Sequence, residues 1–259
     1  MSIRRIIRAD GRRHDELRSI TIERGVNSYA EGSALIRWGG TVVHCTASLE
    51  NRVPSFIKGH GTGWVTAEYS MLPRATQERN HRDRKREISG RSCEIQRLIG
   101  RSMRGAVYMG SLGERTVHID CDVLQAAGGT RTASITAAFI CLVDALRMIA
   151  DADRLANIPL ASQIAAVGVG LVGGHKMLDL SYEEDSTAEV DCNIAMTSAG
   201  EFIEIQSTGE KRSFSRIVLG HMIKLADDGL KRIFAMQREA LDLSPDEKSL
   251  FDHLAAGEE

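Results

Sequence analysis

The sequence predicts an α+β protein in which two similar halves, about residues 10–155 and 156–242, pack together as one domain. Short segments rich in β-branched or alternating residues, punctuated by glycine, are typical of strands. Longer segments with apolar residues at three- and four-residue steps are typical of helices. Both patterns occur twice in the same order, strands first and a long helix afterwards. A chain of 259 residues, 42% of them hydrophobic, can bury a sizeable core.

The first half is expected to open with strands joined by tight turns. The strand segments are 20–23, 33–37 and 41–49, with glycines between them. A glycine-rich segment, 59–63, precedes Trp64 to Tyr69 and is expected to be a flexible turn. A helix follows, whose apolar face is formed by Ile95, Leu98, Ile99, Met103 and Ala106 and whose other face carries Arg97, Arg101 and Arg104. A strand over 117–124 then leads through the turn Gly128-Gly129-Thr130-Arg131 into a second helix over 132–149.

The second half is expected to repeat this order. Strands are predicted over 165–171, 176–180, 190–196 and 202–206, with a long helix after them. Ser213 is predicted to cap that helix, and Gly229 to weaken or bend it. The remaining segment, about 243–259, is an acidic tail with little to pack beyond Leu250, Phe251 and Leu254.

Charge is distributed unevenly along the chain. The formal net charge of −2 argues against a generic nucleic-acid coat protein. The segment from Arg74 to Arg104 nevertheless holds ten basic residues against four acidic ones. This concentration suggests a track for a polyanion, and its alternative is an ordinary solvated surface loop.

Cysteine spacing and hydropathy indicate the cellular setting. The five cysteines form no C-x-x-C pair and lie mostly in apolar segments, so they are expected to be reduced and packed. The first 18 residues are charged throughout, and no apolar run approaches about 18 residues. We therefore expect a cytoplasmic protein with no membrane partner.

The turn Gly128-Gly129-Thr130-Arg131 has the features of an anion site. Glycines allow close backbone approach, a helix start offers unpaired N–H groups, and a guanidinium matches two oxygens of a phosphate. Arg91, which follows Gly90 at the start of the earlier helix, could converge on the same anion. The alternative is an ordinary strand-to-helix turn with Thr130 as N-cap and an exposed arginine.

Two carboxylates are candidates for chemistry. Asp191 lies on the opposite strand face from Cys192, Ile194 and Met196, and Asp185 precedes that strand. Together they could hold Mg²⁺, one could donate a proton, or both could pair structurally with arginines. A rival metal cluster, His118, Asp120 and Asp122, shares one face of another strand, although acids beside an anion site would repel its ligand.

Several motifs occur together in a characteristic order. They are Asp10-Gly11-Arg12, the segment from Gly63 to Tyr69 followed by Met71-Leu72-Pro73-Arg74, the segment from Glu94 to Arg101, and Asp120 to Gln125 before Gly128 to Ser134. This combination closely resembles the ribonuclease PH family of bacterial phosphorolytic exoribonucleases, which are tRNA nucleotidyltransferases. The match runs from about Arg8 to about Leu241.

The resemblance implies a ribonuclease PH fold, of the ribosomal protein S5 domain 2-like type, with two ββαβ-like halves and helices packed against mixed sheets. It also implies a homohexamer built as a trimer of dimers, which trims the 3′ ends of tRNA precursors with inorganic phosphate and releases nucleoside diphosphates. The reverse reaction would add nucleotides to RNA 3′ ends.

The resemblance also assigns roles to residues. Arg91, Gly129, Thr130 and Arg131 match the family's phosphate site, and Asp185 and Asp191 match its catalytic and Mg²⁺ pair. Arg74, Arg79 and Arg82 match arginines of an RNA-facing loop. Two rival functions remain at this point: a hydrolytic nuclease, and a non-catalytic ring scaffold of the kind that lacks the acids or the phosphate arginines.

Overall fold

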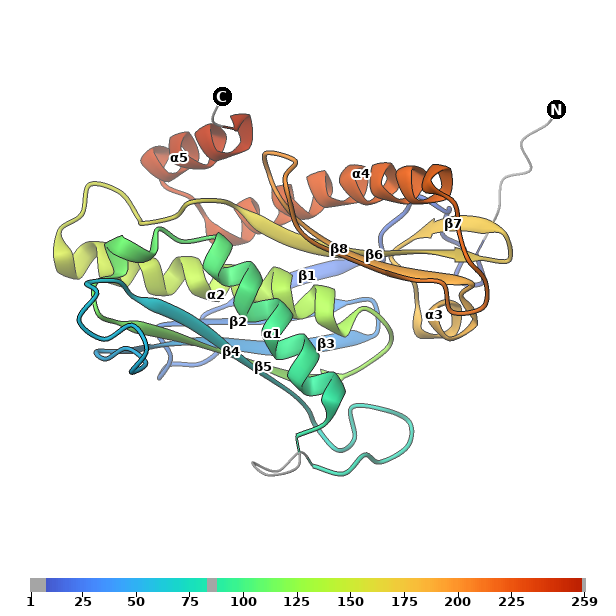
Figure 1. Ribbon diagram of the computed structural model, residues 1–259, viewed down its shortest axis with the longest axis horizontal. Helices are drawn as coiled ribbons and strands as arrows, with labels where there is room; N and C mark the ends of the chain where they lie inside the picture. Colours follow the sequence, from blue (N-terminus) through green and yellow to red (C-terminus); the bar gives the residue numbers. More distant parts are fainter. Residues whose placement is uncertain (1–7, 83–87, 258–259) are drawn as a thin grey trace.

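The computed structural model describes residues 8–82 and 88–257 and has the predicted α+β architecture. Two sheets and their helices stack in layers: the first sheet, then α1 and α2, then the second sheet, then α4 (Figure 1). The core between the layers is continuous across both halves. The two halves therefore share one hydrophobic core.

The first sheet has five strands in the order β1-β2-β3-β5-β4. Their bounds are β1 (Ile20–Arg24), β2 (Gly32–Trp38), β3 (Thr41–Glu50), β4 (Trp64–Met71) and β5 (Thr116–Gln125). Apolar side chains of β3 and β5 face the helices, and the alternate polar ones face outward. Because β4 and β5 run parallel, their C-terminal ends lie at the same edge of the sheet.

Three helices follow from the first half: α1 (Gly90–Gly105), the short 3-10 helix η1 (Met109–Leu112) and α2 (Thr130–Asp153). α2 lies between the two sheets, which explains why it is apolar on nearly every side (Figure 1). It is the one described helix long and apolar enough to cross a bilayer, but 83% of that stretch is buried inside the protein.

The second half comprises β6 (Ile164–Val172), β7 (His175–Leu178), α3 (Tyr182–Thr187), β8 (Val190–Thr197), β9 (Phe202–Thr208), α4 (Arg216–Leu241) and α5 (Pro245–Ala256). The sheet order is β7-β6-β8-β9, and every neighbouring pair is antiparallel. β9 is therefore an edge strand. α4 covers the face of this sheet that is turned away from α2 (Figure 1).

Three local expectations need correction. Ser215, not Ser213, caps α4, because its side chain accepts the hydrogen bond from the backbone N–H of Val218. Gly229 lies in the middle of a continuous α4, where a Cβ would come within 2.8 Å of Leu178, so it serves close helix–sheet packing. The predicted strand 176–180 ends at Leu178.

The C-terminal segment contributes more to the core than its composition suggests. α5 begins with a capping box formed by Ser244 and Glu247. Phe251 is fully buried and packs edge-on against Phe139 of α2, with 6.3 Å between ring centroids. An acidic amphipathic helix therefore closes one end of the core.

The cysteines are all free, as expected. Cys45, Cys121, Cys141 and Cys192 are buried, and Cys93 is exposed.

Candidate functional site

The candidate site forms where the ends of β4 and β5 meet the second half. β5 leads through residues 126–129 into α2, and the segment after β4 leads to α1. Ser89 caps α1, its side chain accepting a hydrogen bond from the N–H of Ser92. Two helix N-termini therefore point toward one region, and both favour negative charge there.

A cleft of about 70 Å³ lies at this junction. Its lining includes all six residues predicted for phosphate, catalysis and metal: Arg91, Gly129, Thr130, Arg131, Asp185 and Asp191. The structure thus brings together residues separated by up to a hundred positions. The volume is about twice that of one liquid water, so the cleft suits a small ion rather than a whole nucleotide.

The two glycines of the turn have different structural roles. Gly128 has φ +94°, and a Cβ there would lie 2.8 Å from the carbonyl oxygen of Leu180, so glycine allows the turn to pack against the second half. Gly129 has φ +67° and is the N-cap of α2, without a side-chain cap. The alternative with Thr130 as N-cap is wrong: Thr130 is the first helical residue, and its hydroxyl is available for other contacts.

Arg91 and Arg131 supply the positive charge. Arg131 Nη1 donates to Glu94 Oε1 at 3.0 Å and also to the side-chain oxygen of Gln206. Glu94 belongs to α1 and Gln206 to β9, so the guanidinium is held between the halves. Arg91 is exposed, and among residues 8–82 and 88–257 none accepts a hydrogen bond from its guanidinium.

Asp185 and Asp191 supply negative charge from the second half. Burial raises the pKa of Asp185, and Arg91 and Arg131 partly oppose that rise. Burial and the neighbouring Asp185 raise the pKa of Asp191 to about 6. Asn193 donates a hydrogen bond of 2.9 Å to Asp191 from the same face of β8. The acids are close enough to repel one another.

These acids fit a divalent cation. Within residues 8–82 and 88–257, neither Asp185 nor Asp191 forms an ion pair at salt-bridge distance, so their charge is not neutralised by a fixed partner. Mg²⁺ prefers oxygen ligands and is commonly held by one or two carboxylates with waters and substrate phosphates. The donor set here is of that kind.

A buried network that sequence reasoning missed borders the cleft, which Asp179 helps to line. Asp179 has φ +54° and accepts hydrogen bonds from the Arg18 guanidinium and, at 2.8 Å, from Trp38 Nε1. Arg18 also donates to the carbonyls of Ala127 and Gly128. The Arg18–Asp179 pair thereby joins the glycine turn to the second half. Its only sequence signal is an aspartate between two leucines in a predicted strand.

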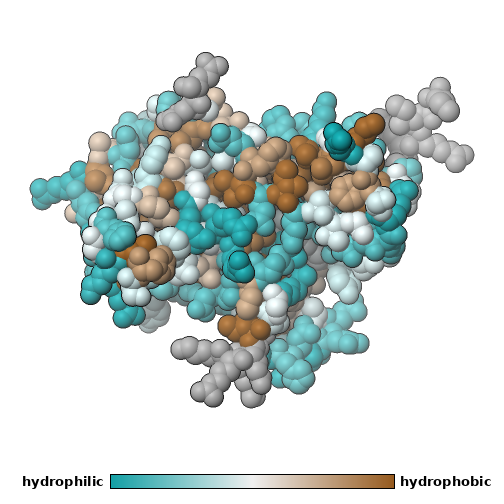
Figure 2. All heavy atoms as spheres, in the orientation of Figure 1, coloured by the Kyte–Doolittle hydropathy of each residue, from teal (hydrophilic) through white to brown (hydrophobic). Residues whose placement is uncertain are grey.

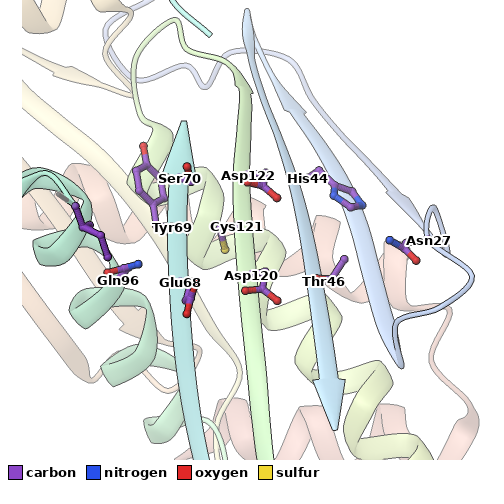
Figure 3. Close-up of a pocket in the computed structure, with 11 residues that line it drawn as sticks. Asn27, His44, Thr46, Glu68, Tyr69, Ser70, Gln96, Asp120, Cys121 and Asp122 are labelled. Carbon is purple, nitrogen blue, oxygen red and sulfur yellow. The ribbon is translucent and has the colours of Figure 1, made fainter. Parts of the chain in front are cut away.

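The rival cluster does not form a metal site in the described part of the chain, which holds no suitable group of three or more His, Cys, Asp or Glu side chains. His118 contacts Glu50 at 3.1 Å. Asp120 and Asp122 line a separate, wide hollow on the outer face of the first sheet, with Glu68 and His44 (Figure 3). Burial and neighbouring acids raise the pKa of Asp120.

The predicted RNA arginines lie outside the cleft. Arg74, Arg79 and Arg82 are exposed in the segment after β4 and are not among the described residues that line it. That segment is anchored by Ala75, whose carbonyl accepts a 2.7 Å hydrogen bond from the N–H of Ala126 beside the glycine turn. The part of the basic segment at 83–87 lies outside the described residues.

Comparison with known proteins identifies the family of this chain. Residues 16–147 match domain 1 of the 3′ exoribonuclease family (RNase PH), and residues 162–229 match domain 2. The chain also superposes on three solved structures: the Archaeoglobus fulgidus exosome with RNA bound to the active site, Rrp46 of rice (Oryza sativa), and an archaeal exosome core.

The three structural likenesses are similar in strength. The first has a TM-score of 0.74 at 22% identity and covers 87% of this chain and 91% of that one. Rice Rrp46 has a TM-score of 0.73 at 19% identity and covers 90% of this chain and 100% of that one. The archaeal exosome core has a TM-score of 0.72 at 21% identity and covers 89% of this chain and 91% of that one. At these identities they establish the fold. Because both family domains match in order over most of its length, the chain belongs to the 3′ exoribonuclease family of RNase PH.

Proposed function

We propose that this protein is a phosphate-dependent 3′→5′ exoribonuclease that releases nucleoside diphosphates and, in reverse, adds nucleotides to RNA 3′ ends. One observation carries this proposal: an ion-sized cleft in which hydrogen-bond donors for phosphate from one half face two acids from the other that form no ion pair with any described residue. A non-catalytic ring scaffold has no need of either set, and here both are present.

Inorganic phosphate is the expected nucleophile. Arg91, Arg131, the Thr130 hydroxyl and the backbone at Gly129 would hold it in line with the last phosphodiester of the RNA. The two helix N-termini add fixed positive potential. Attack on the phosphorus forms the new P–O bond, and the bond to the 3′ oxygen of the shortened RNA breaks.

Asp185 and Asp191 would serve the leaving side of the reaction. They are proposed to hold Mg²⁺, which would offset charge on the scissile phosphate when bound. Asn193 keeps the Asp191 carboxylate in place. The departing 3′ oxygen needs a proton, and Asp185 or water is proposed to supply it.

The RNA strand is expected to be held through its backbone. Arg74, Arg79 and Arg82 extend from the segment anchored beside the glycine turn and are proposed to contact phosphates. The chain has only four tyrosines, two tryptophans and six phenylalanines, so extensive base stacking is not expected. Sequence preference should therefore be weak.

The preferred substrates are proposed to be tRNA precursors, trimmed in the cytoplasm by a homohexamer. Apolar residues gather over the second sheet and α4 on the face seen in Figure 2. Phe202 and Ile205 of the edge strand β9 and Ile217 of α4 are exposed, and exposed apolar groups beside an open strand edge favour association. The likeness to two exosome structures also favours an assembly of subunits.

Product identity tests the proposal against its nearest rival. A 3′-labelled RNA is incubated with Mg²⁺, with and without inorganic phosphate, and the released nucleotide is identified by chromatography. We expect nucleoside diphosphate, formed only with phosphate. A hydrolytic nuclease would release monophosphate at the same rate in phosphate-free buffer, which would overturn the proposal.

A further inference from the structure

Tyr69 lies directly behind the glycine turn and has no role in the function proposed above. It is in β4 and only 2% exposed. Its hydroxyl donates a 2.9 Å hydrogen bond to Thr130 Oγ1 at the start of α2. Glu68, Tyr69 and Ser70 all border the outer hollow, but the ring of Tyr69 lies on the α1 side of β4 (Figure 3).

We propose that Tyr69 is a positioning residue that orients the Thr130 hydroxyl toward bound phosphate. A threonine hydroxyl has one proton and two lone pairs, and its proton rotates to the best available acceptor. With Tyr69 donating to one lone pair, the Thr130 proton is left to point at an acceptor in the cleft. The inference rests on the proposed function, since it assigns the phosphate as that acceptor.

The surroundings of the phenol keep it able to donate. Burial raises the pKa of Tyr69, while Thr130, Arg91 and Arg131 partly oppose that rise, so the phenol is protonated at neutral pH. The same arginines line the cleft. A hydroxyl that accepts a hydrogen bond becomes a better donor, so the chain from Tyr69 through Thr130 to an anion is mutually strengthening.

The competing interpretation is that Tyr69 only fills space in the core. The two interpretations differ in which atoms matter. If packing is the whole role, the ring is sufficient and the phenol oxygen is dispensable for phosphate binding. If positioning is the role, removal of that one oxygen weakens phosphate binding while the ring still fills the core.

The test is Tyr69→Phe in a cycle with Thr130→Val. Wild type, both single variants and the double variant are compared, with Tyr29→Phe as the control because Tyr29 is 95% exposed. For each variant we would measure KM for inorganic phosphate, kcat, Kd for RNA at fixed salt, and the rise in Tm caused by inorganic phosphate alone.

Tyr69→Phe should raise KM for phosphate roughly 3- to 10-fold, the range of one net hydrogen bond. The phosphate-induced rise in Tm should shrink, and Kd for RNA should change less than about twofold, as expected when no phosphate contact of the RNA is lost. In the Thr130→Val background the same substitution should leave KM unchanged, because the hydroxyl it orients is gone.

An unchanged KM in Tyr69→Phe, or an equal rise in both backgrounds, would overturn the inference. If Tyr69→Phe does not fold, Thr130→Ser is compared with Thr130→Val, because only the serine variant keeps a hydroxyl at this position. Equal KM for phosphate in these two variants would also overturn the inference. A wild-type enzyme that shortens RNA without phosphate would instead overturn the proposed function, so the two failures are distinguishable.

Discussion

The two halves of the molecule contribute opposite charges to one cleft. The first half provides Arg91, Thr130, Arg131 and two helix N-termini, whereas the second provides Asp185 and Asp191. Neither set alone would favour phosphoryl transfer, because one binds only the anion and the other repels it. The cleft would therefore act as a reaction site only when the halves are held at a fixed separation.

Three contacts hold that separation. The Arg18–Asp179 ion pair is nearly fully buried, with side chains 7% and 2% exposed. The glycine turn packs directly against the segment before α3, and the N–H of Tyr182 donates to the carbonyl of Ala127. Arg131 is itself tied to both Glu94 and Gln206.

The largest effect is expected from removal of the acidic side. Asp185→Ala with Asp191→Ala should lower kcat roughly a thousandfold or more, about 4 kcal/mol in the barrier, because the pair proposed to hold Mg²⁺ is lost. Phosphate binding, measured as the phosphate-induced rise in Tm, should be retained or become tighter. Glu183→Ala is the matched control, since Glu183 is an exposed acid of the same helix. RNA shortening retained in the double variant would contradict the site.

The next largest effect concerns the connection between the halves. Asp179→Asn leaves the Arg18 charge buried without its partner and should lower the free energy of unfolding by about 3 kcal/mol. Asp153→Asn breaks a half-exposed pair with Arg115 and should cost less than about 1 kcal/mol. Urea denaturation measures both. Equal losses would mean that the buried pair does not join the halves.

Two substitutions, one in the cleft and one in the exposed basic segment, test whether phosphate and RNA bind at separate places. Arg131→Ala should lower kcat/KM for phosphate about 100-fold, because a charged donor to the transition state is removed, and leave Kd for RNA nearly unchanged. Arg79→Ala, in the exposed segment, should weaken RNA binding and leave KM for phosphate unchanged. Parallel losses in both variants would show that phosphate and RNA sites are not separate.

The smallest expected effect is a pH dependence of stability in metal-free buffer. The pKa of Asp191 is raised to about 6 in the folded protein. As pH rises, the Asp191 carboxyl therefore loses its proton at lower pH in the unfolded chain than in the folded protein. Folded stability therefore falls between about pH 4 and 6, by an amount of order 2 kcal/mol. Asp191→Asn should exceed wild type in stability above pH 6, with the gap closing toward pH 4.

Urea denaturation at several pH values, with EDTA present, measures this gap. Added Mg²⁺ should stabilise wild type more than Asp191→Asn at pH 7, because the ion replaces the proton as partner of the carboxylate. A gap that is constant with pH would show that Asp191 titrates normally.

Much of the fold and site could be predicted from local sequence. Alternation in β3 and β5 and apolar spacing in α1 and α2 depend on nearby residues, so the elements were predictable to within a few positions. The Arg18–Asp179 pair and the Tyr69–Thr130 hydrogen bond join residues 161 and 61 positions apart, which no local pattern reveals. Ser213 and Ser215 are equally good caps by type, and only the backbone path selects Ser215.

Isotope transfer from phosphate distinguishes phosphorolysis from hydrolysis in a single reaction. RNA is shortened by wild-type protein in inorganic phosphate labelled with ¹⁸O, and the released nucleotides are examined by mass spectrometry. Phosphorolysis in the cleft between the halves predicts nucleoside diphosphates in which one phosphoryl group carries the label. Unlabelled nucleoside monophosphates, which take ¹⁸O only from labelled water, would contradict it.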